Sequence, residues 1–312
     1  MLVACVLGIQ LLTTIFFFAR VFSRRILLRT WKLDDTLLSI AFTLSWIQFI
    51  LTWTSASSGA GRHTETLSDF QKQRLAILDY IQGGLYRLEI AVVKLSICAF
   101  YLNIFRQRLH RNAIFGCIVF IVVSFLVVEG FFLFKCTPIS LAWDISISKE
   151  GACLDPRPDM LISTSSSIVA DLWIMTTVIP LLLSLQLHYH QKVATLIIVN
   201  LGWVAIAASL VRNIYFTSVL AKIDPDPAWY SVEVQILSFI EANVGIICAS
   251  VAGVQPLLNK LRRKPLTTVT TTTATATDIT ASKRCVVVVQ DIEASASGES
   301  LPAYEVTVKA GT

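Results

Sequence analysis

The chain has 312 residues, of which 54% are hydrophobic and 15% are charged, and its formal net charge is +5. A soluble globular domain carries nearer 25% charged residues. This composition therefore excludes an ordinary soluble protein and indicates a chain whose outer surface faces lipid.

Seven apolar stretches are each long enough to cross a bilayer, which takes about 20 mostly apolar residues. Hydrocarbon offers the backbone no hydrogen-bond partner, and a helix satisfies its own backbone groups. We therefore predict an all-α fold, a seven-transmembrane helix bundle over residues 1–258, with the lipid bilayer as its partner. The predicted spans are Leu2–Phe22, Asp35–Thr54, Tyr80–Phe105, Ala113–Lys135, Leu161–Leu187, Val193–Ala221 and Val232–Leu257.

The segments between the spans differ in character. Arg20–Asp35 is first basic and then acidic, and its spacing predicts an amphipathic helix at the membrane surface. Leu67–Leu78 has helical apolar spacing within a polar connection. Residues 259–312 include Thr267–Thr280, where nine of fourteen residues are threonine, a composition that cannot bury enough apolar area to fold. We predict a disordered cytoplasmic tail over 259–312.

Basic residues are distributed unequally between the two sides of the predicted bundle. Thirteen Lys and Arg residues lie in the first, third and fifth connections and at the start of the tail, against seven on the other side. Cytoplasmic loops collect Lys and Arg, so we predict an external N-terminus and a cytoplasmic C-terminus. Membrane topology accounts for these basic residues, and we expect no nucleic-acid partner.

Two cysteines, Cys136 and Cys153, lie in the connection between the fourth and fifth spans, on the predicted outer side. An oxidising compartment favours a disulfide between them. The alternative is a pair of free thiols at a helix end.

Charged residues inside membrane spans are costly and are usually functional or paired. At about 1.5 Å per residue, Glu89, Asp171, Arg212 and Glu241 all lie near the middle of the membrane, and Lys94 lies about one turn deeper. Two interpretations remain open. In the first, these residues form a polar pocket that is open to the outside and binds a ligand. In the second, they form a buried ion-pair network in which Arg212 pairs with Glu241 or Asp171.

Several kinds of chemistry have no support in the sequence. The stretch Val232–Leu257 contains no lysine, which rules out a retinal Schiff base in that helix. No metalloprotease, serine-hydrolase or phosphate-loop pattern occurs. The hydroxyls of Ser163–Ser167 have no evident base beside them. We therefore expect no catalytic residue, metal site or cofactor, and an intramembrane enzyme is the least favoured class.

Short motifs spread over roughly residues 15–260 resemble one family, the fungal rhodopsin-domain integral membrane proteins. The order and spacing of the motifs carry the resemblance more than any single motif does. Two residues, Asn103 and Gly253, depart from the family pattern. The matching residues are Arg20–Arg24, Leu33–Asp35, Lys94–Ser96, Phe100–Tyr101, Cys136, Trp143, Cys153, Asp171, Pro180, Gly202, Arg212, Glu241 and Val244–Cys248.

The resemblance implies a receptor-like protein of G-protein-coupled-receptor type in the plasma membrane, without enzymatic activity. Such a protein would sense an extracellular or membrane-soluble small molecule, of unknown identity, and would act through a cytoplasmic signalling partner. Members of the family are also encoded in toxin clusters. The alternative is therefore a membrane component of a secondary-metabolite (mycotoxin) gene cluster that acts in transport, sensing or tolerance.

Overall fold

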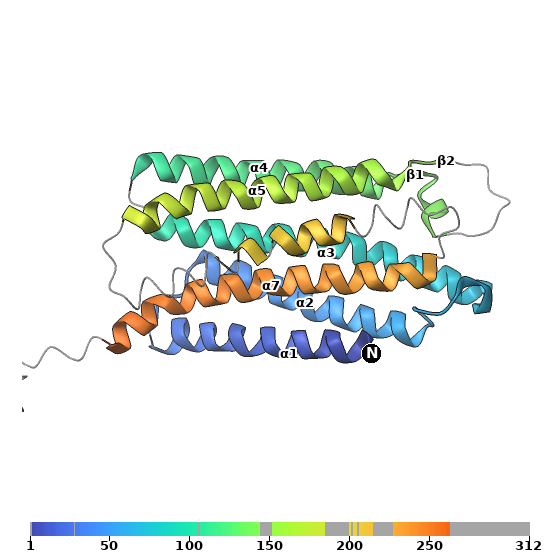
Figure 1. Cartoon of the computed structure of the whole chain (residues 1–312), viewed down its shortest axis with the longest axis horizontal. Helices are drawn as coiled ribbons and strands as arrows, with labels where there is room; N and C mark the ends of the chain where they lie inside the picture. Colours follow the sequence, from blue (N-terminus) through green and yellow to red (C-terminus); the bar gives the residue numbers. More distant parts are fainter. Residues whose placement is uncertain are drawn as a thin grey trace, which may run out of the picture. The chain divides into compact units, whose positions relative to one another are not determined.

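The computed structural model describes residues 2–27, 29–104, 107–143, 152–184, 200, 202–204, 206–214 and 227–262. Long helices lie side by side along a common direction in the unit Met1–Lys264 (Figure 1). The predicted disordered tail falls almost entirely outside the described residues, although its first residues, from 259, continue the last helix as far as Arg262.

The described part of the chain contains six long helices. Two of them, α3 and α7, have 36 residues each and extend well beyond the spans predicted for them. In particular, α3 begins at Asp69 and so includes most of Leu67–Leu78, the stretch with helical apolar spacing. The helices are α1 (Leu2–Val21), α2 (Leu33–Ser57), α3 (Asp69–Ile104), α4 (Arg108–Leu133), α5 (Pro156–Ser184) and α7 (Pro227–Arg262).

Among the described residues, five helices are long and apolar enough to cross a membrane by length and composition, against the seven spans that we predicted. The third predicted span is missing from this group because the apolar part of α3 carries three charged residues, Arg87, Glu89 and Lys94, within one span length. The sixth is represented by a short apolar helix, Gly202–Ile214, because much of Val193–Ala221 lies outside the described residues. The five are Ala4–Leu27, Leu33–Ser57, Arg108–Leu133, Pro158–Ile179 and Val232–Gly253.

The helix α3 occupies the centre of the bundle and packs against α2, α4 and α7. One apolar cluster joins α3 with α4, α5 and α7 around Cys98, Ile114 and Ile174. A second cluster joins α1 and α2 to α3 and α7 around Leu38 and Ile246. Because α1 also packs along α7, the first and last helices of the chain are neighbours.

The connection after α1 differs from our prediction. Residues Phe22–Leu27 form a π-helix that continues α1. The side chain of Arg20 is 2% exposed and that of Arg24 is also buried, so these cations point into the bundle. The prediction of an amphipathic surface helix was therefore wrong for these two residues, although Arg25 and Ile26 are exposed. The physical reason is a pair of acids on α2, described below, that offers the two arginines a buried partner.

At one end of the bundle, a disulfide joins Cys136 to Cys153, which confirms the predicted bridge. The two cysteines face each other in a two-stranded antiparallel hairpin, β1 (Cys136–Thr137) and β2 (Ala152–Cys153). We call this the hairpin end of the bundle; it is visible beside the ends of α4 and α5 (Figure 1). The bridge ties the start of α5 to the end of α4.

Removing this disulfide should lower the free energy of unfolding by about 3 kcal/mol, since it closes a loop of 17 residues. The measurement is thermal unfolding of the purified protein with Cys136→Ser and Cys153→Ser, singly and together. A matched control is Cys5→Ser, which removes an exposed free thiol and should leave stability unchanged. If both Cys136 and Cys153 can be alkylated in the unreduced protein, the bridge does not form.

Candidate functional site

The end of the bundle opposite the hairpin is closed by a buried ion cluster, which we call the Arg20 cluster (Arg20, Arg24, Asp34 and Asp35). The Arg20 guanidinium lies 2.7 Å from the Asp34 carboxylate and 2.8 Å from that of Asp35. It also donates to the carbonyl oxygen of Ala249 on α7. Arg24 lies 3.9 Å from Asp34. These contacts join α1, α2 and α7.

The Arg20 cluster extends to α3 through Asp34. The hydroxyl of Ser96 donates to the Asp34 carbonyl oxygen at 2.8 Å, and the amide of Asn103 donates to its carboxylate at 3.3 Å. The ring of Phe100 lies under the guanidinium groups of both Arg20 and Arg24. Four helices therefore share one fully buried charge cluster.

Gly253 allows Arg20 to reach this position. A β-carbon at Gly253 would lie 2.6 Å from the guanidinium carbon of Arg20, which its two ion pairs hold in place. We expect Gly253→Ala to destabilise the protein by about 1–3 kcal/mol through this overlap. The matched control is Gly130→Ala on α4, where a β-carbon would meet nothing within 4 Å. Thermal unfolding of both variants tests this, and equal unfolding temperatures would contradict it.

Near the middle of the bundle, Arg212 is paired with Glu241. The guanidinium Nε of Arg212 lies 3.2 Å from the Glu241 carboxylate, and both side chains are buried. The Tyr86 hydroxyl donates to the same carboxylate at 2.8 Å, and the Ser209 hydroxyl donates to its other oxygen. The ring of Tyr86 also lies beneath the Arg212 guanidinium. Of the two partners that we considered for Arg212, the structure selects Glu241.

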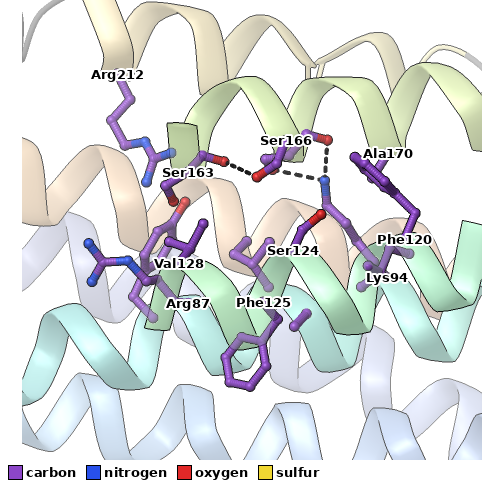
Figure 2. Close-up of a pocket in the computed structure, with 15 residues that line it drawn as sticks. Arg87, Lys94, Phe120, Ser124, Phe125, Val128, Ser163, Ser166, Ala170 and Arg212 are labelled. Atoms are coloured by element: carbon purple, nitrogen blue, oxygen red, sulfur yellow. Dashed lines mark hydrogen bonds between the residues drawn. The ribbon is translucent and has the colours of Figure 1, made fainter. Parts of the chain in front are cut away.

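Asp171 is engaged elsewhere. The Lys94 ammonium lies 2.8 Å from the Asp171 carboxylate and donates to the carbonyl and the hydroxyl oxygens of Ser167 at 2.6 and 2.8 Å. Lys94 lies at one end of a small pocket of about 60 Å³, and Arg87 and Arg212 lie at the other (Figure 2). Lys94 therefore does not extend to the membrane surface; it joins α3 to α5.

Glu89, the fifth predicted residue, stands apart from both ion pairs. Its side chain is 1% exposed and lies near Ser45 on α2, whose hydroxyl is within hydrogen-bond distance of Gln10 and Asn243. One of its carboxylate oxygens, Oε1, has no hydrogen-bond partner. Among the described residues no Lys, Arg or His lies within 4.0 Å of this carboxylate. The five predicted residues thus form two ion pairs and one buried acid without a cation.

A cavity of about 620 Å³ opens in the hairpin-end half of the bundle. Apolar side chains from four helices and from the connection after β2 supply most of its wall, among them Val128, Phe131, Phe132, Ile162 and Phe239. Small-molecule sites in proteins have volumes of about 300–1,000 Å³ and mostly apolar walls with a few placed polar groups. The cavity has the size and the wall of such a site.

Most of the charged groups of the cavity come from α3, α5 and the segment Gly202–Ile214. Arg87 on α3 lies 2.7 Å from Asp159 on α5, and its guanidinium stacks on Phe132 at 3.9 Å. Arg212 lines the cavity from the segment Gly202–Ile214, and Glu89 lines it from α3. The cavity therefore contains residues of both the predicted polar network and a third ion pair.

Sequence reasoning missed several residues of this site. Arg87 lies in the third predicted span, where a charge is costly, and that signal would have found it. Asp159 lies before its predicted span, so nothing in the sequence marked it as a buried partner. Tyr86 is an aromatic residue at helical spacing, which more often indicates simple packing. Within the described residues, no group of three or more His, Cys, Asp or Glu side chains could hold a metal ion.

A bundle of apolar helices with ion pairs in its interior defines a multi-pass membrane protein. The family described as "Fungal rhodopsin domain" matches residues 19–260. The chain belongs to this family, and the resemblance seen in its motifs is confirmed.

One curated relative is the "Polyenoic acids biosynthesis gene cluster protein Ba17b" of Metarhizium anisopliae. The two proteins are 24% identical over 217 residues, which cover 65% of this chain and 58% of the relative. The chain therefore matches less than two thirds of that relative's length. No solved structure matches the chain significantly.

Proposed function

We propose that this protein is a receptor-like sensor that binds a small molecule in the hairpin-end cavity and acts through a cytoplasmic signalling partner. The observation that carries the proposal is the cavity of about 620 Å³, whose wall includes the buried pairs Arg87–Asp159 and, through Arg212, Arg212–Glu241. A ligand that competes for either pair would change which helices are held together. Conformational transitions in proteins commonly break and re-form ion pairs between packed elements.

A second candidate function rests on the relative from Metarhizium anisopliae, whose name places it in a biosynthesis gene cluster. By this proposal the chain is a membrane component of such a cluster and acts in transport, sensing or tolerance of its product. The cavity would serve a transported product as well as a sensed one. Loss of a sensor should change a transcriptional response, whereas loss of a cluster component should change the export or the level of the product.

The experiment is deletion of the gene in its fungal host, followed by complementation with cavity variants. Val128 lines the cavity and is 5% exposed, whereas its neighbour Val127 faces outward. For a sensor, Val128→Phe should fail to restore the transcriptional response to culture extract, and Val127→Phe should restore it. Unchanged transcription with altered export or product level would favour the second function.

We also propose that the protein lies in the plasma membrane with its N-terminus outside. The unequal distribution of basic residues and the disulfide at the hairpin end support this orientation, because disulfides persist in oxidising compartments. A tag fused after Thr312 should resist protease added to sealed cells. Digestion of the tag without permeabilisation would reverse the orientation.

The proposed role includes no enzymatic step. The buried acid Asp171 is paired with Lys94, and Glu241 is held by Arg212 and by the hydroxyl groups of Tyr86 and Ser209, which leaves both poorly placed to serve as general bases. Purified protein should therefore turn over no substrate at a rate that depends on these carboxylates.

A further inference from the structure

Four buried oxygen atoms of residues that line the hairpin-end cavity have no hydrogen-bond partner, and with the two carboxyl groups among them ionised each of the four is an acceptor. Against these four oxygens, the lining residues have one buried donor without a partner, the Nε–H of Arg87. Buried polar groups are costly unless they are hydrogen-bonded, so this surplus of acceptors describes what is missing from the cavity. The four are Gln48 Oε1, Glu89 Oε1, Asp159 Oδ1 and Gln235 Oε1.

The two amide oxygens cannot be turned into donors by rotating the amide groups. The Gln48 nitrogen donates to the carbonyl oxygen of Gln82 at 3.2 Å. The Gln235 nitrogen donates to the carboxylate of Asp79. Rotation would place an oxygen against an oxygen in both cases. The acceptors are therefore a fixed property of the site.

The charged residues of the cavity lining also indicate that a cation is missing. Its acids are Asp79, Glu89, Asp155 and Asp159, and its cations are Arg87, Lys135 and Arg212. Arg87 is matched by Asp159, and Arg212 is matched by Glu241 behind the wall. Among the described residues Glu89 is left with no cation. A buried carboxylate without a counter-charge is strongly unfavourable.

We propose that the cavity takes an amphipathic cation, a protonated amine on an apolar body. The ammonium group supplies the counter-charge and N–H donors for Glu89, and the apolar body packs against Phe131, Phe132 and Phe239, which line the cavity. A fatty acid or other anion would add a carboxylate to a site that already has too many acceptors. The inference rests on the proposed function, in that it names the chemical class of the ligand.

The test uses three probes that share one apolar body: 3-phenylpropylamine, 3-phenylpropan-1-ol and 3-phenylpropanoate. Binding to the full-length protein in lipid nanodiscs is measured by calorimetric titration and by the shift in unfolding temperature. The amine should bind and raise the unfolding temperature, and the alcohol and the carboxylate should bind at least about 30-fold more weakly, as expected when a buried charge pair is lost.

Two acid-to-amide variants locate the charge. Glu89→Gln should weaken amine binding at least about 30-fold and abolish the preference for the amine over the alcohol. Glu65→Gln, which alters an exposed acid outside the cavity, should leave both unchanged. If Glu89→Gln does not fold, the discrimination between the three probes by the unaltered protein is still decisive.

The possible failures are distinguishable. If the carboxylate or the alcohol binds more tightly than the amine, and Val128→Phe abolishes that binding, the proposal of a cationic ligand is wrong but the cavity remains a ligand site. Equal amine binding by Glu89→Gln and the parent protein would also overturn it. If none of the probes binds, the acceptors are satisfied by water and this inference fails, and the complementation with Val128→Phe decides the proposed function separately.

Discussion

Replacing Arg20 by methionine is expected to lower the free energy of unfolding by about 3–5 kcal/mol, because two buried carboxylates lose their main counter-charge. The side chains of Asp34 and Asp35 are no more than 2% exposed, so water cannot replace the guanidinium. The variant would also lose the hydrogen bond to the Ala249 carbonyl oxygen. Denaturant or thermal unfolding of protein purified in detergent measures the effect.

The matched control for this prediction is Arg25→Met, which removes an exposed arginine five positions along the chain and should change stability by less than about 0.5 kcal/mol. Neutralising both acids together with Arg20, as Arg20→Met with Asp34→Asn and Asp35→Asn, should recover part of the loss. If Arg20→Met and Arg25→Met unfold alike, the Arg20 cluster does not hold the bundle together.

The second large effect is expected at Arg212 and Glu241. Arg212→Met and Glu241→Gln should each destabilise the protein by about 3–5 kcal/mol, since each leaves the other charge buried without its counter-charge. The double variant should cost about 0.5–3 kcal/mol less than the sum of the single changes. Thermal unfolding of the three variants completes the cycle.

Asp171 supplies the control for that cycle, because it pairs with Lys94 instead of Arg212. Arg212→Met and Asp171→Asn should therefore combine additively, within about 0.5 kcal/mol. Additivity in the Arg212–Glu241 cycle, or coupling in the Arg212–Asp171 cycle, would contradict the pairing that the structure describes.

The sequence predicted the elements of this fold because apolar length and helical rise translate directly into spans and depths. It placed Arg212, Glu241 and Asp171 at one depth, which made two pairings possible. The choice between them depends on how far each helix is rotated about its own axis, and composition says nothing about that angle. Lys94 faces α5 in the structure, and that orientation leaves Glu241 for Arg212.

The connections were harder to predict than the helices. Basic residues after a span are usually assigned to the membrane surface, and that rule failed for Arg20 and Arg24 because their partners, Asp34 and Asp35, are carried by the next helix. The cavity was also beyond the sequence. Its wall is formed by residues of α2, α3, α4, α5 and α7, of the segment Gly202–Ile214 and of the connections at the hairpin, and no single stretch of sequence predicts it.

The contact between Arg20 and the Ala249 carbonyl oxygen has a consequence for the making of this protein. A ribosome releases α1 and α2 early, and Arg20 can meet Asp34 and Asp35 as soon as this first pair of helices is inserted. Its acceptor on α7 is translated more than two hundred residues later. Until then, one N–H group of a lipid-embedded guanidinium stays without its final acceptor. This contact therefore forms only after α7 has been made, and a chain that stops short of α7 leaves that N–H group without its acceptor.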